Sequence, residues 1–105
     1  MHQIKTFYAK PSENRERYRS GILIEPLPDA CQVLIVVMAR ELKAKGFQCI
    51  HFLLTDAMAA SEWCEAVGVE GVNGIGGILG IWILDKDPTD CIDIVREVIK
   101  KHCEG

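Results

Sequence analysis

A run of seven consecutive apolar residues, Val33–Ala39, constrains the fold of this chain more than any other feature of its sequence. The run is rich in β-branched residues and by itself fits a buried strand as well as a helix. The surrounding segment, Pro28–Gly46, is longer than a typical strand, and Gly46 follows Lys43 and Lys45 as a helix-ending glycine does. The sequence therefore predicts a helix, and a helix without a polar face is usually covered on more than one side.

Turn residues divide the rest of the chain into short segments with strand or helix patterns. Strands are expected at Ile4–Ala9, Arg15–Glu25, Gln48–Leu54 and Ile78–Leu84, and two further helices at Ala57–Val67 and from Asp87 to about His102. The first two strands read as an antiparallel hairpin that ends at Pro26 and Pro28. Gln48–Leu54 is apolar on both faces, so we expect it at the centre of the sheet.

The order β-β-α-β-α-β-α predicts a single α/β (α+β) domain over residues 1–105. Residues 1–27 form its N-terminal β-hairpin and residues 28–105 its α-β-α-β-α part. We expect a small two-layer sandwich in which three helices pack on a four-stranded mixed sheet.

The chain carries more apolar surface than a domain of its size usually covers. With the nine glycines counted and the two tyrosines left out, about 55% of its 105 residues are apolar, against roughly 45–50% in typical domains. A small domain buries only about 60–70% of its unfolded surface, so we expect a second copy of the chain to cover part of the excess. The candidate contact residues lie on the expected first helix and the last strand: Val33, Val36, Val37 and Trp82.

Charge is unevenly distributed along the chain. The net charge of −3 argues against a generic attraction to nucleic acid or to anionic lipid. The first twenty residues are nevertheless basic, and in an extended segment Arg15, Arg17 and Arg19 would share one face. Such a face either binds carboxylates or phosphates, for example the phosphates of nucleic acid, or is a solvated hairpin surface.

Glycines in Gly71–Gly80 invite a nucleotide-binding interpretation. A G-x-G-x-x-G fingerprint starting at Gly74 fails at Leu79, and these glycines lead into a strand rather than a helix. Two interpretations stay open, namely close backbone packing and a ligand loop at Gly74, Gly76 and Gly77. The acidic cluster Asp85–Asp93 either caps the final helix or joins this loop in a small-molecule or enzyme site.

The five cysteines and three histidines favour no specific chemistry. An odd number of cysteines without C-x-x-C spacing predicts buried thiols and no disulfide. Cys91 falls in the first turn of the final helix, where a thiolate is favoured, but Asp90 and Asp93 flank it. The histidines lie in different elements. No apolar segment has the length of a signal peptide or a membrane span, so we expect a cytoplasmic protein. We expect no catalytic residue, no metal and no cofactor.

These observations lead to one expected function and two alternatives. The chain is expected to be a small non-enzymatic binding or protein-interaction module that forms a homodimer and does not bind membranes. The first alternative is a small-molecule-binding domain or an enzyme that uses Gly71–Gly80 and Asp85–Asp93. The second is a nucleic-acid-binding protein that uses the hairpin with Arg15–Arg19.

Overall fold

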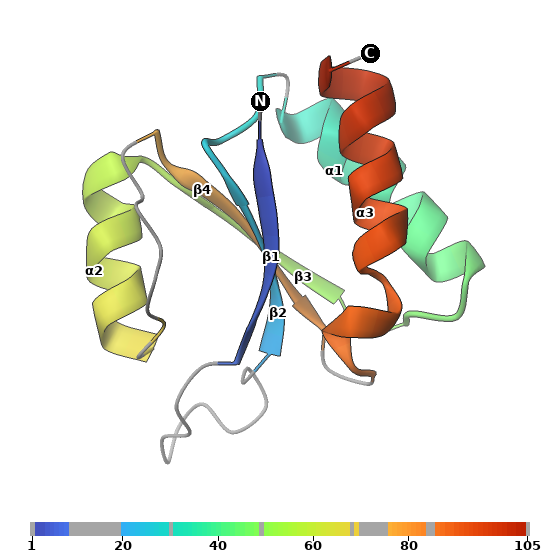
Figure 1. The fold of residues 1–105 in the computed structure, drawn as a ribbon, viewed down its shortest axis with the longest axis horizontal. Helices are drawn as coiled ribbons and strands as arrows, with labels where there is room; N and C mark the ends of the chain where they lie inside the picture. Colours follow the sequence, from blue (N-terminus) through green and yellow to red (C-terminus); the bar gives the residue numbers. More distant parts are fainter. Residues whose placement is uncertain are drawn as a thin grey trace.

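Four strands form one antiparallel sheet in the computed structural model, which describes residues 2–8, 20–29, 31–48, 50–67, 69, 76–83 and 86–104. The strands are β1 (Gln3–Tyr8), β2 (Ser20–Glu25), β3 (Ile50–Thr55) and β4 (Ile78–Ile83), in the spatial order β1-β2-β4-β3. The predicted hairpin pairing of β1 with β2 is confirmed. The expected mixed sheet is antiparallel throughout, because β4 lies between β2 and β3 and runs opposite to both (Figure 1).

The strand at β3 lies at an edge of the sheet, so the prediction that it is central was wrong. The central positions belong to β2 and β4, and all six residues of β4 are buried. In β3, His51 is exposed and the side chain of Leu54 is 44% exposed. Both β3 and β4 are largely apolar on both faces, so composition alone did not identify the central strand. Only β4 is buried on both faces.

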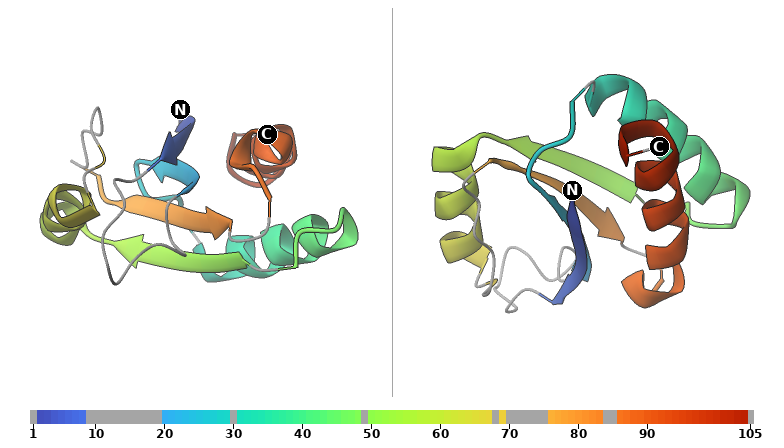
Figure 2. Two further views of the ribbon diagram at one scale, coloured as in Figure 1. Left: turned by 90° about the horizontal axis from the view of Figure 1, so that it is seen from below. Right: turned by 45° about the horizontal axis from the view of Figure 1, so that its top comes forward.

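Helices cover both faces of the sheet, which gives three layers instead of the expected two. One face carries α1 (Cys31–Ala44) and α3 (Ile92–Ile99), and the other carries α2 (Ala57–Val67) (Figures 1 and 2). A short 3-10 turn, η1 (Pro88–Asp90), precedes α3, and a π-helical turn, η2 (Lys100–Glu104), continues it. The predicted class, four strands and three helices in a mixed α/β domain, is confirmed.

The ends of the helices follow the signals expected from the sequence. Gly46 adopts a φ of 96°, which favours glycine, and the amide of Phe47 donates a 3.0 Å hydrogen bond to the carbonyl of Leu42. At the start of α2, Oδ1 of Asp56 accepts a 2.9 Å hydrogen bond from the amide of Ala59. These contacts satisfy backbone groups that a helix end leaves without partners.

The larger core lies between the sheet and the pair α1 and α3. In α1, the buried side chains Leu34, Met38 and Leu42 recur every fourth residue and so form one stripe. In α3, the corresponding side chains are Val95, Val98 and Ile99. Each fully buried side chain of this size stabilises the fold by roughly 1.5–3 kcal/mol relative to an exposed one. This packing fixes α1 and α3 side by side on one face of the sheet.

Candidate interaction surface

The apolar run in α1 is only partly covered by the rest of the chain. Leu34 and Met38 are 3% and 0% exposed, whereas Val33 and Val36 are 65% and 57% exposed. The two exposed valines lie outside the stripe that contacts the sheet. The cover expected on more than one side of this helix is therefore incomplete within a single chain.

A groove of about 420 Å³ runs between α1 and α3, and Val37, one turn of helix after Val33, lines it. The two helices are antiparallel, since Val33 lies near Cys103 at one end, whereas Lys45 and Asp93 line the groove toward the other (Figure 1). Apolar and charged side chains line it together: Val37, Glu41, Lys45, Asp93, Ile94, Glu97, Val98, Lys101 and His102. The apolar members are buried or half-buried and the charged ones are exposed, so the groove has an apolar floor and a polar rim.

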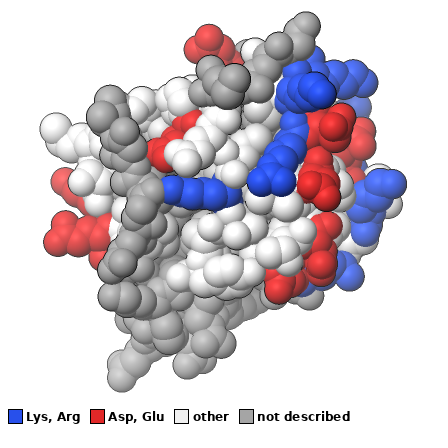
Figure 3. Space-filling view, viewed as in Figure 1, with Lys and Arg blue, Asp and Glu red and all other residues white. Residues whose placement is uncertain are grey.

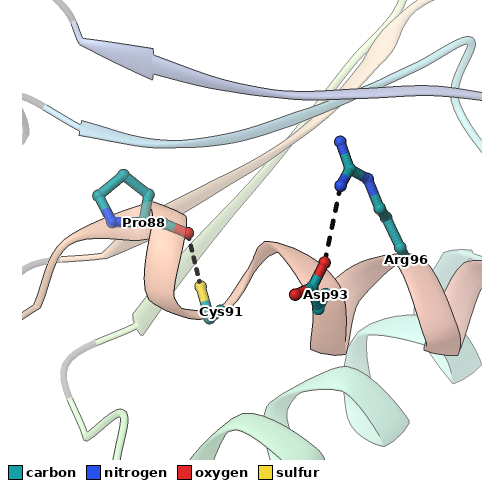
Figure 4. A network of polar contacts seen from close by, with 4 residues as sticks. All are labelled: Pro88, Cys91, Asp93 and Arg96. Carbon is teal, nitrogen blue, oxygen red and sulfur yellow. Dashed lines mark hydrogen bonds and ion pairs between the residues drawn. The ribbon is translucent and has the colours of Figure 1, made fainter.

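The rim of the groove differs in charge between its two ends. Glu41, Asp93 and Glu97 lie toward the start of α3, together with Lys45, and Lys101 and His102 lie toward its end. Part of the acidic charge is neutralised within α3, because Nη1 of Arg96 lies 3.6 Å from Oδ1 of Asp93 (Figure 4). Charged side chains of both signs gather over the side of the molecule that carries α1 and α3 (Figure 3). We call this surface, with Val33, Val36 and the groove, the α1–α3 face.

Trp82, expected at a contact between chains, lies inside the domain. Its side chain is 8% exposed and packs under α2, with its ring centroid 5.0 Å from that of Phe7 and 5.3 Å from that of Trp63. The rings meet edge to face, an arrangement that aromatic pairs favour. Of the four candidate contact residues, Val33 and Val36 are exposed on the α1–α3 face and Val37 lines its groove.

The described glycines of the predicted loop pack against the chain itself. Gly77 has a φ of 78°, and a Cβ atom there would overlap the carbonyl oxygen of Thr55. A Cβ atom on Gly76 would overlap Pro26, and the carbonyl of Gly76 accepts a 3.1 Å hydrogen bond from the amide of Leu27. These contacts account for both glycines through close backbone packing. Gly74 lies outside the described residues.

The basic and acidic clusters of the sequence are only partly described. Arg15, Arg17 and Arg19 lie outside the described residues, as does Asp85. Asp87 caps η1: its Oδ1 accepts hydrogen bonds from the amide and the hydroxyl of Thr89, at 2.9 and 2.8 Å. Those bonds, joined by one from the hydroxyl of Tyr8, hold the pKa of the Asp87 carboxyl below its ordinary value. The capping interpretation therefore explains Asp87.

Two buried cysteine thiols, those of Cys91 and Cys64, are not activated. Cys91 is fully buried, and burial, with a smaller effect of Asp90, raises its pKa to about 11. Its Sγ donates a 3.4 Å hydrogen bond to the carbonyl oxygen of Pro88 (Figure 4). Burial also raises the pKa of Cys64. A thiol is nucleophilic as its thiolate, so these two groups are poorly suited to nucleophilic chemistry at neutral pH.

Neither a cation site nor a membrane span is found in the described part of the chain. No group of three or more His, Cys, Asp or Glu side chains there has an arrangement that could hold a metal ion. No helix there combines the length and the apolar composition needed to cross a bilayer.

The charged rim of the groove is the part of this surface that the sequence reasoning missed. A signal was present, because Glu41 and Lys45 are four residues apart, as are Asp93, Glu97 and Lys101 in turn. That spacing places each set on one face of its helix. The missing information was that α1 and α3 lie side by side, which joins the two sets into one surface.

Comparison with known proteins provides no assignment for this surface: no family model, no curated protein and no solved structure matches the chain.

Proposed function

We propose that this protein is a small non-enzymatic interaction module that forms a homodimer through its α1–α3 face. The observation that carries the proposal is the exposure of Val33 and Val36, at 65% and 57%, next to a groove with an apolar floor. Contiguous apolar surface of this kind, rimmed by polar residues, is typical of protein–protein contacts.

The partner we propose is a second copy of the chain, because the charges of the groove complement themselves. In a dimer with a two-fold axis across the middle of the groove, each end of one groove meets the opposite end of the other. The end with Glu41 and Glu97 then faces Lys101 and His102 of the second copy. Val37 and Val98, which line the groove between these ends, lie near the axis.

The apolar part of this contact supplies most of its affinity, and the charged ends orient the two copies. Burial of apolar area contributes roughly 25 cal/mol per Å², and a stable interface covers about 800 Å² on each partner. Exposed ion pairs contribute little each, about 0–1 kcal/mol, but charge complementarity selects the relative orientation of the two chains.

The decisive experiment is sedimentation equilibrium at micromolar concentration on the protein and on the double variant Val33→Glu/Val36→Glu. The protein is expected to sediment as a dimer of two 11.7 kDa chains, and the double variant as a single chain. Both valines are exposed, so the change places charge on the surface and leaves the buried stripe of α1 intact. Far-UV circular dichroism of the variant should match that of the protein.

Met58→Glu is the matched control. Met58 is 77% exposed on α2, on the opposite face of the sheet from α1 and α3, and its replacement should leave the dimer unchanged. A single-chain mass for the unmodified protein over the micromolar range overturns the homodimer. A dimer that survives the valine double variant overturns the α1–α3 face as its contact.

A further inference from the structure

Two half-buried cysteines that are far apart in the sequence, Cys31 and Cys103, lie at the same end of the helix pair. Cys31 begins α1, and Cys103 lies in η2, the turn that continues α3. Because α1 and α3 are antiparallel, these two helix ends are neighbours. Both side chains pack against the core between the helices and the sheet.

A small hollow of about 90 Å³ lies between the helix ends, and Cys103 lines it together with residues that are close to Cys31 in the sequence. One side of it is formed by Asp29, Val33 and Leu34, the residues that flank Cys31 in the sequence. The other side is formed by His102 and Cys103. Burial, and to a smaller extent Cys103, raise the pKa of Cys31.

We propose that Cys31 and Cys103 form a redox-modification site, which a small disulfide such as oxidised glutathione converts to a reversible disulfide within one chain. The other described thiols are unsuited to this reaction, since Cys64 is 8% exposed and Cys91 is fully buried. The structure has all four described cysteines as thiols, which is the reduced state of this site.

The reaction balances as two thiol–disulfide exchanges. The thiolate of one cysteine attacks a sulfur of oxidised glutathione; the S–S bond of glutathione breaks and one glutathione thiolate leaves. The second cysteine then attacks the mixed disulfide, the Cys31–Cys103 bond forms, and the second glutathione leaves. The two protein thiols give up two protons, which the two glutathione thiolates take up. The two cysteines are oxidised and one glutathione disulfide is reduced.

Closing this bond would link the start of α1 to the end of the chain's last helical turn. A cross-link between positions so distant in the sequence restricts the unfolded chain strongly and thus stabilises the folded one. Both sulfurs belong to one chain, but Val33 and His102 are shared by the hollow and the α1–α3 face, so the reaction is best followed at a protein concentration below the dissociation constant of the proposed dimer.

The test is to incubate the reduced protein with an excess of oxidised glutathione at pH 8.5 and to follow its intact mass under denaturing conditions. The expected product is a single chain lighter by about 2 Da, the mass of two hydrogens, with the Cys31 and Cys103 peptides joined in a non-reducing map. Its Tm is expected to rise by roughly 8 °C or more, and dithiothreitol should reverse both changes.

The variants Cys31→Ser and Cys103→Ser separate the proposed pair from the other thiols. Each should stop at the mixed disulfide, gaining the mass of one bound glutathione and losing the rise in Tm. A map that joins either cysteine to Cys49, or a disulfide between two chains, overturns the proposal. So does a wild-type protein that keeps two glutathiones without closing the bond. Since the variants change one half-buried sulfur to oxygen, unchanged circular dichroism shows that they fold.

Discussion

The hydroxyl of Tyr8 donates a 3.0 Å hydrogen bond to Oδ1 of Asp87, across 79 positions of the sequence. The same oxygen accepts hydrogen bonds from the amide and the hydroxyl of Thr89, so one atom connects the end of β1 with the turn that starts the last helix. This contact raises the pKa of Tyr8 and contributes to the lowered pKa of Asp87. The first strand and the last helix are thus joined at their surface as well as through the core.

Replacing Asp87 by alanine is expected to lower the Tm by roughly 4–8 °C, the shift typical of losing a helix cap in a domain of about 100 residues. Tyr8→Phe removes one of the three hydrogen bonds and should lower it less. Because the folded pKa of Asp87 lies below its ordinary value, the stabilisation is present above the unfolded pKa, about 3.9, and is lost as pH falls through the folded pKa.

Thermal unfolding at pH 7 and at lower pH values measures both effects, and Asp93→Ala is the control. Asp93 is exposed and pairs within its own helix, so its loss should change the Tm little. An ultraviolet titration gives a second readout, since the raised pKa of Tyr8 should return toward 10.0 in Asp87→Ala. A difference in Tm that stays constant down to pH 2 would contradict the role assigned to this carboxylate.

Two glycines in the central strands should differ in how much stability is lost when alanine replaces them. A Cβ atom on Gly21 would overlap the carbonyl oxygen of Ile81 and lie 2.8 Å from Cε1 of Phe7, so Gly21→Ala should cost about 2 kcal/mol or more. A Cβ atom on Gly80 would have its nearest neighbours at 3.7 Å, an ordinary contact. Gly80→Ala should therefore change stability by less than about 1 kcal/mol.

Urea unfolding of the two glycine variants checks this contrast. The m-value should stay constant in both, because neither change alters the surface exposed on unfolding. Equal urea midpoints for the two variants would contradict this prediction. They would mean that β2 and β4 move apart at Gly21 to accommodate the added methyl group at little cost.

The parts of the fold that could be predicted from the sequence are those set by nearest neighbours along the chain. The helix Ala57–Val67 has the predicted ends, because Asp56 supplies a cap that depends on residues three positions away. The helix end at Gly46 and the cap at Asp87 are likewise local. Such signals act within one turn of helix and need no knowledge of the remaining chain.

The strand order and the candidate surface could not be predicted because they depend on contacts between distant residues. Nothing local distinguishes Gln48–Leu54, which forms an edge strand, from Ile78–Leu84, which forms a central one; the difference lies in which strands pair. For the same reason Trp82 was expected at a surface, whereas Phe7 and Trp63, far away in sequence, surround it. The exposure of Val33 and Val36 likewise depends on which face of α1 packs on the sheet.

Stability should fall at alkaline pH because of Cys91. Its folded pKa, about 11, lies above the ordinary value of 9.0, so its stabilising effect is fully present below pH 9 and is lost as pH rises toward 11. A pKa shift of this size corresponds to about 2–3 kcal/mol of the free energy of unfolding.

The measurement is the free energy of unfolding of the protein and of Cys91→Ser, whose hydroxyl does not titrate, between pH 8 and pH 11. The variant is less stable at pH 8, and the difference between the two should shrink by that amount at pH 11; a constant difference would contradict a protonated, buried thiol.

Reversing charges at the two ends of the groove should weaken and then restore the proposed dimer. Glu97→Lys places a second positive charge opposite Lys101 of the second copy, and two-fold symmetry repeats this repulsion, so the dissociation constant should rise roughly tenfold. Lys101→Glu should have the same effect, because it brings two negative charges together. The double variant Glu97→Lys/Lys101→Glu restores attraction between opposite charges and should regain most of the affinity.

The repulsion in the single variants is screened by salt, so their affinity should approach that of the wild-type protein as the salt concentration rises toward 1 M. Glu62→Lys makes the same change of charge at an exposed position of α2, away from the α1–α3 face, and should leave the affinity unchanged. Sedimentation equilibrium at several salt concentrations measures the protein and all of these variants. The contradicting outcome is a double variant whose loss of affinity equals the sum of the losses in the two single variants. It would show that the two ends of the groove do not meet, which excludes the two-fold arrangement even if the protein is a dimer.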